Sequence, residues 1–465
     1  MNTPIYDFVK DYVSKNPIRL HMPGHKGSST DAWMDQASKY DITEIDGADY
    51  LSAPTGIIAE SEANAGKLFG CHTFYSTEGS SLCIRAMLFL VKKYAKQKGH
   101  EPLILAGRNV HASFVNAAAV LDINVDWIMQ KESDSYESCS ITGEDIETVI
   151  KGYLNTEYLI KKLPDAVYVT SPDYLGNMLN IKELEDICHK YGILLLVDNA
   201  HGAYLKFLKN SLHPIDLGAD MCCDSAHKTL PVLTGGAYLH ISEKSDWFFA
   251  QNAKQAMAVF ATTSPSYLIL QSLDICNKYI SEQTVQGNNI FQQTEEKVKS
   301  LKEALIKIGY ILSGDEALKI ALTVPDGDKL AKELITENIY IEYHDQDHIV
   351  MMFGSDTADE DYTKIQNALE KYVFGQTGAG REDVNSGNVK KSRKETPRKV
   401  MSMHDALLAK TEQVQATDCI GRTLAEPVLS CPPCVPLYVY GEKIGEDILK
   451  YIPEQKNVAV VCTKK

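Results

Sequence analysis

The sequence predicts an α/β protein built on a mostly parallel sheet with helices on both faces. Between about residues 60 and 245, short apolar runs alternate with segments of helical periodicity. Most of these runs lack the polar alternation of a strand with one face in water, which is expected of strands buried on both faces. With 465 residues, the chain is long enough for two or three domains and a large core.

The alternation places each expected element. Strands are expected at Thr73–Ser76, Leu103–Ala106, Ala166–Thr170, Ile193–Val197 and Met221–Cys223, and helices at Ser81–Gln97, Ser113–Leu121, Gly143–Tyr153 and Ile181–Tyr191. A further apolar run, "AYLHI", follows two glycines and predicts another strand. Ligands of such sheets bind beyond the carboxyl ends of the strands, so functional side chains are expected there.

The rest of the chain, from about residue 246 onwards, predicts smaller units. A helical region is expected over about residues 246–308, and the runs "LKIALTV" and "IYIEYHDQDHIVMMF" then predict a small α+β unit. The polar, glycine-rich and finally basic segment "GQTGAGREDVNSGNVKKSRKETPRK" is typical of an exposed linker. Residues 401–465 are expected to form a last unit, a helix followed by "CPPCVPLYVYGEKI".

Composition narrows the class of protein. A net charge of -15 argues against a nucleic-acid or anionic-membrane partner, and no apolar run approaches the length of a membrane span. The N-terminal "MNTPIYDFVKDYV" has acidic residues where a signal peptide is cationic and then apolar, so a cytoplasmic protein is expected. Its eleven cysteines are then expected as thiols, with Cys222 and Cys223 in the core. Cys431 and Cys434 form a C-x-x-C that contains two prolines and has no second pair, so no metal site is expected.

Reactive side chains follow several of the expected strands. The segment "STEGSSLCIRAM" is a Gly-Ser-Ser turn that enters a helix, so Ser80 and Ser81 either bind a phosphate or cap the helix. His111 follows the next strand and is either structural or functional. Asp198 directly follows four apolar residues, and a carboxylate at a buried strand end needs a partner. Lys228 is either an exposed loop charge or a desolvated amine that can form a Schiff base.

One cofactor meets these demands together. Pyridoxal phosphate has an aldehyde that condenses with a lysine, a ring nitrogen that pairs with a carboxylate, and a phosphate that needs donors. The sequence therefore predicts a site for pyridoxal phosphate at these strand ends.

The motifs "PGHK", "VDNAHG", "SAHK" and "TTSP", in this order, resemble those of the Orn/Lys/Arg decarboxylases. These are pyridoxal-phosphate enzymes of fold type I, the aspartate-aminotransferase-like fold. The resemblance runs from "HMPGHKG" to "PPCVPLYVYGEKI", and the length is similar to the shorter bacterial form, which lacks a receiver-like domain. It implies an N-terminal arm (1–30), a cofactor-binding large domain (31–300), a small α+β domain (301–375), a linker (376–400) and a C-terminal domain (401–465).

The resemblance also implies a role for each matching residue. Lys228 would hold the cofactor through a Schiff base, Asp198 would pair with the ring nitrogen, Ala200 would pack under the ring and His111 would stack on its other face. The phosphate would be bound by Gly79, Ser80, Ser81, Ser225 and His227. Thr262 would reach the phosphate of a neighbouring subunit, which implies a homodimer with shared sites.

The implied reaction is the decarboxylation of arginine, lysine or ornithine to an amine, a polyamine precursor. The acids expected near the basic end of the substrate are Asp46, Asp49 and Glu78, for which a solvated loop position is an equally good interpretation. Glu78 and Asp173 depart from the Asn and Thr that are frequent in the family, and Cys434 and Tyr440 depart in the C-terminal motif. The proton that replaces CO2 would come from His227 or Lys228.

Two alternatives stay open at the level of sequence. Another pyridoxal-phosphate reaction, transamination or a Cβ-lyase reaction, is one of them, and aminotransferases of this fold use an arginine to bind the substrate carboxylate. Arg19, Arg85 and Arg108 are available for that role. The other is a non-catalytic relative, against which the presence of both Lys228 and Asp198 counts.

Overall fold

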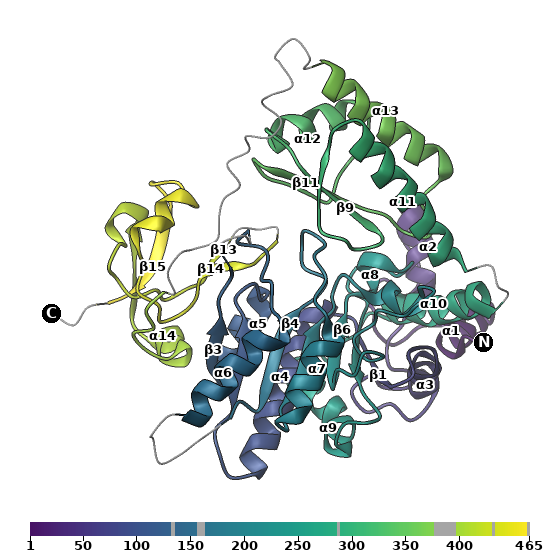
Figure 1. Cartoon of the computed structure of the whole chain (residues 1–465). Helices are drawn as coiled ribbons and strands as arrows, with labels where there is room; N and C mark the ends of the chain where they lie inside the picture. Colours follow the sequence, from purple (N-terminus) through teal and green to yellow (C-terminus); the bar gives the residue numbers. More distant parts are fainter. Residues whose placement is uncertain (132–134, 156–162, 286–288, 376–396, 430–432, 463–465) are drawn as a thin grey trace. The chain divides into compact units, whose positions relative to one another are not determined.

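The computed structural model describes residues 1–131, 135–155, 163–285, 289–375, 397–429 and 433–462 (Figure 1). The chain divides into two compact units. The first comprises Met1–Leu90, Val197–Leu301 and Met352–Thr363, and the second comprises Val91–Leu196, Lys302–Met351 and Lys364–Lys465. The boundaries between the five segments expected from the sequence stay predictions, and most of the expected linker lies outside the described residues.

Seven strands form one sheet. They are β1 (His72–Ser76), β2 (Leu103–Gly107), β3 (Asn124–Ile128), β4 (Ala166–Thr170), β5 (Leu194–Asp198), β6 (Met221–Asp224) and β7 (Ala237–Ile241), hydrogen-bonded in the order β1-β7-β6-β5-β4-β2-β3. Strand β2 pairs in parallel with β3 and β4, whereas β7 pairs antiparallel to both β1 and β6. The mostly parallel sheet and all the expected strands are therefore confirmed, and β3 is an edge strand that the sequence analysis missed.

Burial explains which strands were predictable. Every residue of β6 and β7 is buried, and all of them except Asp224 and His240 are hydrophobic. Strand β3 alternates exposed and buried residues over only five positions, a pattern too short to distinguish it from a loop. Cys222 and Cys223 lie in β6 with no exposed surface, which confirms their expected place in the core.

The first unit places several helices around its strands. They are α1 (Pro4–Ser14), α2 (Ala32–Tyr40), α3 (Ile57–Phe69), the short α8 (Ala226–Thr229), α9 (Trp247–Ala258) and α10 (Tyr267–Val285), with the 3-10 helix η1 (Ala203–Phe207). Helices α4 (Gly79–Gln97) and α11 (Ile290–Lys307) begin in this unit. The helical region expected over residues 246–308 is therefore confirmed as α9, α10 and α11.

Helix α1 is anchored in the core of the first unit. It packs on α3 and α10, and the carboxylate of Asp274 in α10 accepts the backbone N–H groups of Ile5 and Tyr6 at 2.9 and 3.0 Å. These N–H groups belong to the first turn of α1, where they have no partner within the helix. Asp274 also accepts the hydroxyl of Ser61 in α3 at 2.5 Å, so one buried carboxylate joins three helices.

The second unit carries the other flanking helices and the small α+β part. The helices of the large sheet are α5 (Ala112–Val120), α6 (Gly143–Asn155) and α7 (Ile181–Lys190). The small sheet has the order β10-β11-β9-β8, formed by β8 (Ile311–Ser313), β9 (Lys319–Thr323), β10 (Tyr343–His344) and β11 (His348–Met352). Helix α12 (Gly327–Thr336) lies in the second unit, and α13 (Asp359–Gly375) begins in the first unit and continues into the second. The expected α+β unit is thereby confirmed.

The C-terminal part is mostly β-structure. After α14 (Met403–Leu408) come β12 (Thr411–Gln415), η2 (Ala416–Asp418), β13 (Val428–Leu429), β14 (Pro436–Tyr438), η3 (Glu446–Lys450) and β15 (Asn457–Val461). The expected helix is therefore confirmed as a single short one, and the strands after it were not foreseen. Cys431 lies outside the described residues, and Cys434 is half-buried and forms no disulfide. No helix in the described part of the chain is long and apolar enough to cross a membrane.

Candidate cofactor site

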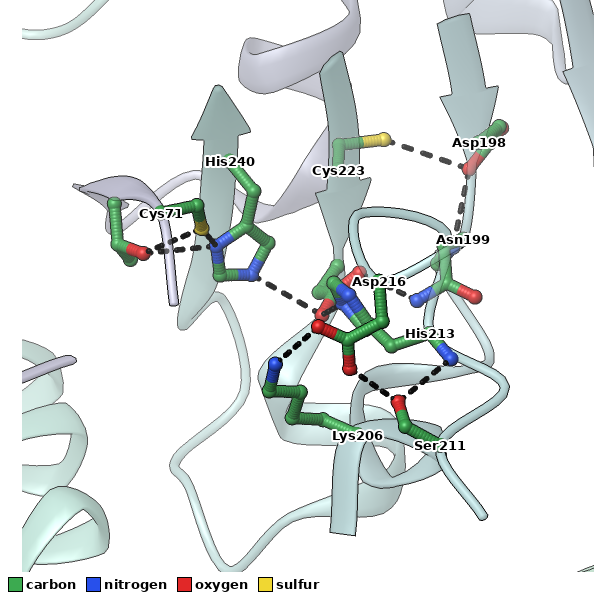
Figure 2. A network of polar contacts seen from close by, with 12 residues as sticks. Cys71, Asp198, Asn199, Lys206, Ser211, His213, Asp216, Cys223 and His240 are labelled. Atoms are coloured by element: carbon green, nitrogen blue, oxygen red, sulfur yellow. Dashed lines mark hydrogen bonds and ion pairs between the residues drawn. The ribbon is translucent and has the colours of Figure 1, made fainter. Parts of the chain in front are cut away.

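Asp198 ends strand β5 inside the protein. The run Leu195–Val197 before it has no exposed surface, and Asp198 itself is only 2% exposed. Its Oδ1 atom accepts the backbone N–H of Ala200 at 3.2 Å and the thiol of Cys223 at 3.5 Å (Figure 2). A buried carboxylate is stable as an anion when donors and a cation surround it, and a protonated ring nitrogen would supply that cation. The geometry of Asp198 therefore fits the cofactor.

Two serines from distant parts of the chain meet at the start of helix α4. The hydroxyl of Ser225 donates to that of Ser80 at 2.8 Å. Gly79 adopts a positive φ of 70°, and its N–H donates to the carbonyl of Gly235 at 2.7 Å. A long helix presents unpaired N–H groups and a partial positive charge at its N-terminus, and hydroxyls beside it add donors. This donor set fits a phosphate.

Lys228 lies on the surface of the single chain. It belongs to the four-residue helix α8 and is exposed, so the interpretation as a desolvated amine is wrong for the isolated chain. Its Nζ atom lies 3.0 Å from the Nε2 atom of His201, which is itself buried. His201 was missed by the sequence analysis. Its signal was available, because it stands three residues after Asp198 in "VDNAHG" and thus follows the same buried strand.

His227 directly precedes Lys228 and is partly committed to the backbone. Its Nδ1 atom lies 2.9 Å from the carbonyl oxygen of Gly236, which can only accept, so Nδ1 carries the proton. Burial lowers the pKa of His227 below its usual value. The neutral ring therefore has an unprotonated Nε2, which accepts hydrogen bonds rather than donating them.

His111 caps helix α5 in the second unit. Its Nδ1 atom accepts the backbone N–H of Ser113 at 3.1 Å and lies 2.9 Å from the hydroxyl of the same residue. Lys228 and Asp198 belong to the first unit, so the expected stacking of His111 on the cofactor ring stays a prediction. The expected contacts of Ala200 and Ser81, which are both half-buried, also stay predictions.

The three acids expected near the substrate differ in their surroundings. Asp49 accepts five backbone N–H groups, those of Tyr50, Thr55, Gly56, Ile58 and Ala59. Burial by itself would raise the pKa of Asp49, but these donors bring it below its usual value. Its carboxylate is therefore engaged at the start of helix α3. Asp46 is exposed, and Glu78 accepts the backbone N–H of Thr262 of the same chain at 2.7 Å.

Two of the three arginines considered for a carboxylate clamp have structural partners. The guanidinium of Arg19 donates to the carbonyl groups of Ser38, Lys39 and Asp41 at the end of α2. Arg108 forms a buried ion pair with Glu442 at 2.9 Å and donates to the carbonyl of Leu437. Arg85 is half-buried in α4. Arg19 and Arg108 therefore stabilise the fold, which weakens the case for transamination.

The sheet topology and the residues at its strand ends fit the pyridoxal-phosphate enzymes of fold type I. The chain belongs to the Orn/Lys/Arg decarboxylase family, whose major-domain model matches residues 3–353. It is thus a pyridoxal-phosphate-dependent amino-acid decarboxylase, as the resemblance in its motifs implied.

Related proteins cover nearly the whole chain. It is 29% identical to an arginine decarboxylase of Bacillus subtilis, over 97% of this chain and 93% of that protein. The structure is similar to a lysine decarboxylase of Francisella novicida, with a TM-score of 0.79 and 17% identity over 99% of this chain and 81% of the other. A lysine decarboxylase of Pseudomonas aeruginosa gives a TM-score of 0.78 at 15% identity, over 99% and 80% of the two chains. At these identities the solved structures show the shared fold alone.

Proposed function

We propose that the substrate is a basic amino acid, arginine, lysine or ornithine, and that the products are CO2 and the corresponding amine, a polyamine precursor. The observation that carries this proposal is the set of groups in one unit: the amine of Lys228, the buried carboxylate of Asp198 and the paired hydroxyls of Ser80 and Ser225. The arginine decarboxylase of Bacillus subtilis supports a basic substrate, because it is related over nearly its full length.

When bound, pyridoxal phosphate supplies an electron-accepting ring that takes up the electron pair left by the departing carboxylate of the substrate. Lys228 would hold the cofactor through its side-chain amine. Asp198 would hold the proton on the ring nitrogen, while Ser80, Ser81, Ser225 and the N–H groups at the start of α4 would bind the phosphate. Contacts of His111 and Ala200 with the ring are what the family resemblance implies.

The proton that replaces CO2 has two candidate donors, and the contacts favour Lys228. The Nδ1 proton of His227 is held by the carbonyl of Gly236, so only an imidazolium form could donate from Nε2. Burial lowers the pKa of His227 and disfavours that form. Lys228 is the amine displaced during turnover, and His201 at 3.0 Å can exchange protons with it.

We also propose that two copies of the chain form a homodimer. The single chain exposes a set of large apolar side chains in its first unit, namely Ile18 (88%), Leu20 (90%), Met22 (62%), Trp33 (74%), Leu233 (52%) and Val259 (55%). Exposed apolar side chains of this size are typical of surfaces that another protein covers. The same unit contains Lys228 and Thr262, so a second copy would supply the burial that Lys228 lacks in the single chain.

A cytoplasmic location agrees with the cysteines. All ten described cysteines are free thiols, as expected in a reducing compartment.

The experiment that tests the function is a substrate screen of the purified, cofactor-loaded protein. Each common amino acid is incubated separately, and CO2, amine and keto acid are measured. Amine and CO2 in equal amounts from one basic amino acid are expected. Keto acid in place of CO2 would establish transamination instead, and turnover of acidic or aromatic amino acids alone would contradict the basic substrate.

A further inference from the structure

A buried cluster of Asp224, His213 and His240 has no part in the function described so far. Its strands explain how two of its members meet. In the antiparallel pair of β6 and β7, His240 lies opposite Cys222, so its side chain is a diagonal neighbour of Asp224 on the same face. On the other side of β7, Thr73 of β1 lies opposite His240. His213 reaches the same point from the segment between η1 and β6.

The carboxylate of Asp224 is fully hydrogen-bonded. Its Oδ2 atom lies 3.0 Å from Nε2 of His213 and 3.2 Å from Nε2 of His240, and its Oδ1 atom accepts the amide of Asn199 at 2.7 Å. Because a carboxylate oxygen accepts, both imidazoles carry a proton on Nε2. The remaining nitrogen of His240 lies 2.9 Å from the hydroxyl of Thr73. Figure 2 shows His240 and His213 converging from opposite sides of β6.

The cluster is sealed from water. Asp224, His213 and His240 have no exposed side-chain surface. The ring of Phe69 at the end of α3 covers both imidazoles, with centroids 4.3 Å from His240 and 5.4 Å from His213. Burial by itself would raise the pKa of Asp224, but the two imidazoles hold it well below its usual value, so Asp224 is an anion. Such a group is costly unless every partner stays in place.

The cluster joins the two anchors of the cofactor. Asn199 follows Asp198 in the chain, its side chain donates to Asp224, and its backbone N–H donates to the carbonyl of Cys223 at 3.0 Å. Asn199 thus ties the end of β5 to the end of β6 by two bonds. Asp224 in turn directly precedes Ser225, whose hydroxyl contacts Ser80. A shift of Asp224 would therefore move both the carboxylate and the phosphate donors.

We propose that Asp224, held by His213 and His240, is a positioning residue for the cofactor carboxylate Asp198 and acts through Asn199. This inference rests on the proposed role of Asp198 toward the ring nitrogen. The hydrogen bonds from His213 and His240 stabilise Asp224, a second buried carboxylate close to Asp198. Other titratable groups also surround the cluster, namely Asp198, Cys223, Cys222, Cys71, and the ion pair of Lys206 and Asp216, which stand on either side of His213 in the chain.

The test compares Asp224→Asn with Asp274→Asn. Both variants change a buried, hydrogen-bonded aspartate of the first unit into its neutral isostere, and Asp274 has no contact with Asn199 or Asp198 among its hydrogen bonds. The measurements are the dissociation constant of pyridoxal phosphate and the pH titration of its visible absorption in the bound state. For Asp224→Asn we expect roughly 10- to 100-fold weaker binding, as is typical of outer-shell groups, together with a displaced titration. For Asp274→Asn we expect lower stability and an unchanged titration.

A second pair of variants covers the case in which Asp224→Asn does not fold. Asn199→Ala removes the side-chain bond to Asp224 but leaves both imidazole contacts of Asp224, and His213→Gln weakens the cluster itself. If Asp224 acts through Asn199, each variant displaces the pH titration of the bound cofactor. The double variant then weakens cofactor binding by less than the sum of the two single effects, expressed as free energies. Titrations that coincide with the wild-type curve in both variants would overturn the proposal.

Two further outcomes are distinguished in the same experiment. Asp198→Asn is included in the same measurements. An unchanged titration in Asp198→Asn would refute the role of Asp198 itself. A titration that changes in Asp198→Asn but not in the variants of Asp224, Asn199 and His213 would refute only the inference about Asp224. Three donor atoms within 4.8 Å could also bind a metal ion, so the metal content of the purified protein is measured. A stoichiometric divalent metal that is lost in His240→Gln would overturn the proposal in favour of a metal site.

Discussion

The Nζ atom of Lys228 lies 3.0 Å from the Nε2 atom of His201. Lys228 belongs to helix α8, and His201 follows strand β5 in the chain. A lysine attacks an aldehyde only as a neutral amine, and an imidazole within hydrogen-bond distance can accept its excess proton. The contact therefore predicts that His201 accepts a proton from Lys228.

His201→Gln is expected to slow the formation of the Schiff base between Lys228 and added pyridoxal phosphate by roughly tenfold or more, because glutamine does not accept a proton from the ammonium group. The rate is followed by visible absorption after mixing cofactor with apoprotein. His72→Gln is the matched control, since His72 is half-buried in the same unit and contacts the ring of Trp247. Equal rates in His201→Gln and wild type over a range of pH would remove His201 from this role.

Lys228→Ala is expected to abolish turnover without loss of the fold, because the side chain is exposed in the single chain and its removal leaves no buried cavity. Amine production and the melting temperature of the apoprotein are measured together. Turnover within tenfold of the wild-type rate would contradict the assignment of Lys228.

Asp198→Asn is expected to retain the cofactor but to lower the rate by several orders of magnitude. The neutral amide cannot hold the proton on the ring nitrogen as an anion does, so the ring accepts electrons less well. Single-turnover kinetics at saturating cofactor separate this effect from binding. A rate close to that of wild type would show that another group protonates the ring.

A mixing experiment tests the shared site. The backbone N–H of Thr262 contacts Glu78 of its own chain, whereas the family resemblance assigns its hydroxyl to the phosphate of a partner. Thr262→Ala alone is expected to weaken cofactor binding about tenfold, and Thr263→Ala, an equally exposed neighbour, is the control. Dissociated and reassociated mixtures of Lys228→Ala with Thr262→Ala should regain activity at limiting cofactor, because one site of each heterodimer is intact. No gain with heterodimers present would mean that each site is built within one chain.

The buried carboxyl group of Asp274 should make the free energy of unfolding depend on pH. Burial raises the pKa of Asp274 from 3.8 to about 6, against the lowering effect of its donors Ser61, Tyr6 and Ile5. The folded state therefore binds the proton more tightly than the unfolded state. The contribution of Asp274 is fully present below about pH 4 and is lost as the pH rises through about 6.

The variant Asp274→Asn isolates this contribution. The free energy of unfolding of wild type relative to Asp274→Asn should fall by on the order of 1–3 kcal/mol between pH 4 and pH 7. Denaturant titrations at matched pH values measure the difference. A difference that stays constant, or that grows with pH, would show that Asp274 does not have a raised pKa.

The strands and helices that could be predicted from the sequence are those with a pattern in a short stretch of neighbouring residues. Strands β4, β5 and β6 are short runs of buried residues, and such runs are recognisable because both faces of a central strand are apolar or small. The cofactor followed from Asp198, Lys228 and the Gly79–Ser81 turn, which come after strands that the same pattern predicts. The family followed from the resemblance of the motifs "PGHK", "VDNAHG", "SAHK" and "TTSP". The small α+β unit was predictable for the same reason.

Contacts between residues that are distant in the sequence became known only from the three-dimensional structure. The carboxylate of Asp49 accepts backbone N–H groups at the start of helix α3, because Asp49 has a positive φ of 68° and the chain after it turns back. Neither composition nor periodicity reveals such a turn. Arg108 pairs with Glu442, more than 300 residues away, and so has a partner in the fold. The meeting of Asp224, His213 and His240 depends on the register of β6 with β7, and a register shift of one residue would turn His240 to the opposite face. Pairing register and loop closure are properties of the whole sheet, and for this reason the cluster beside the cofactor site had no signature in the sequence.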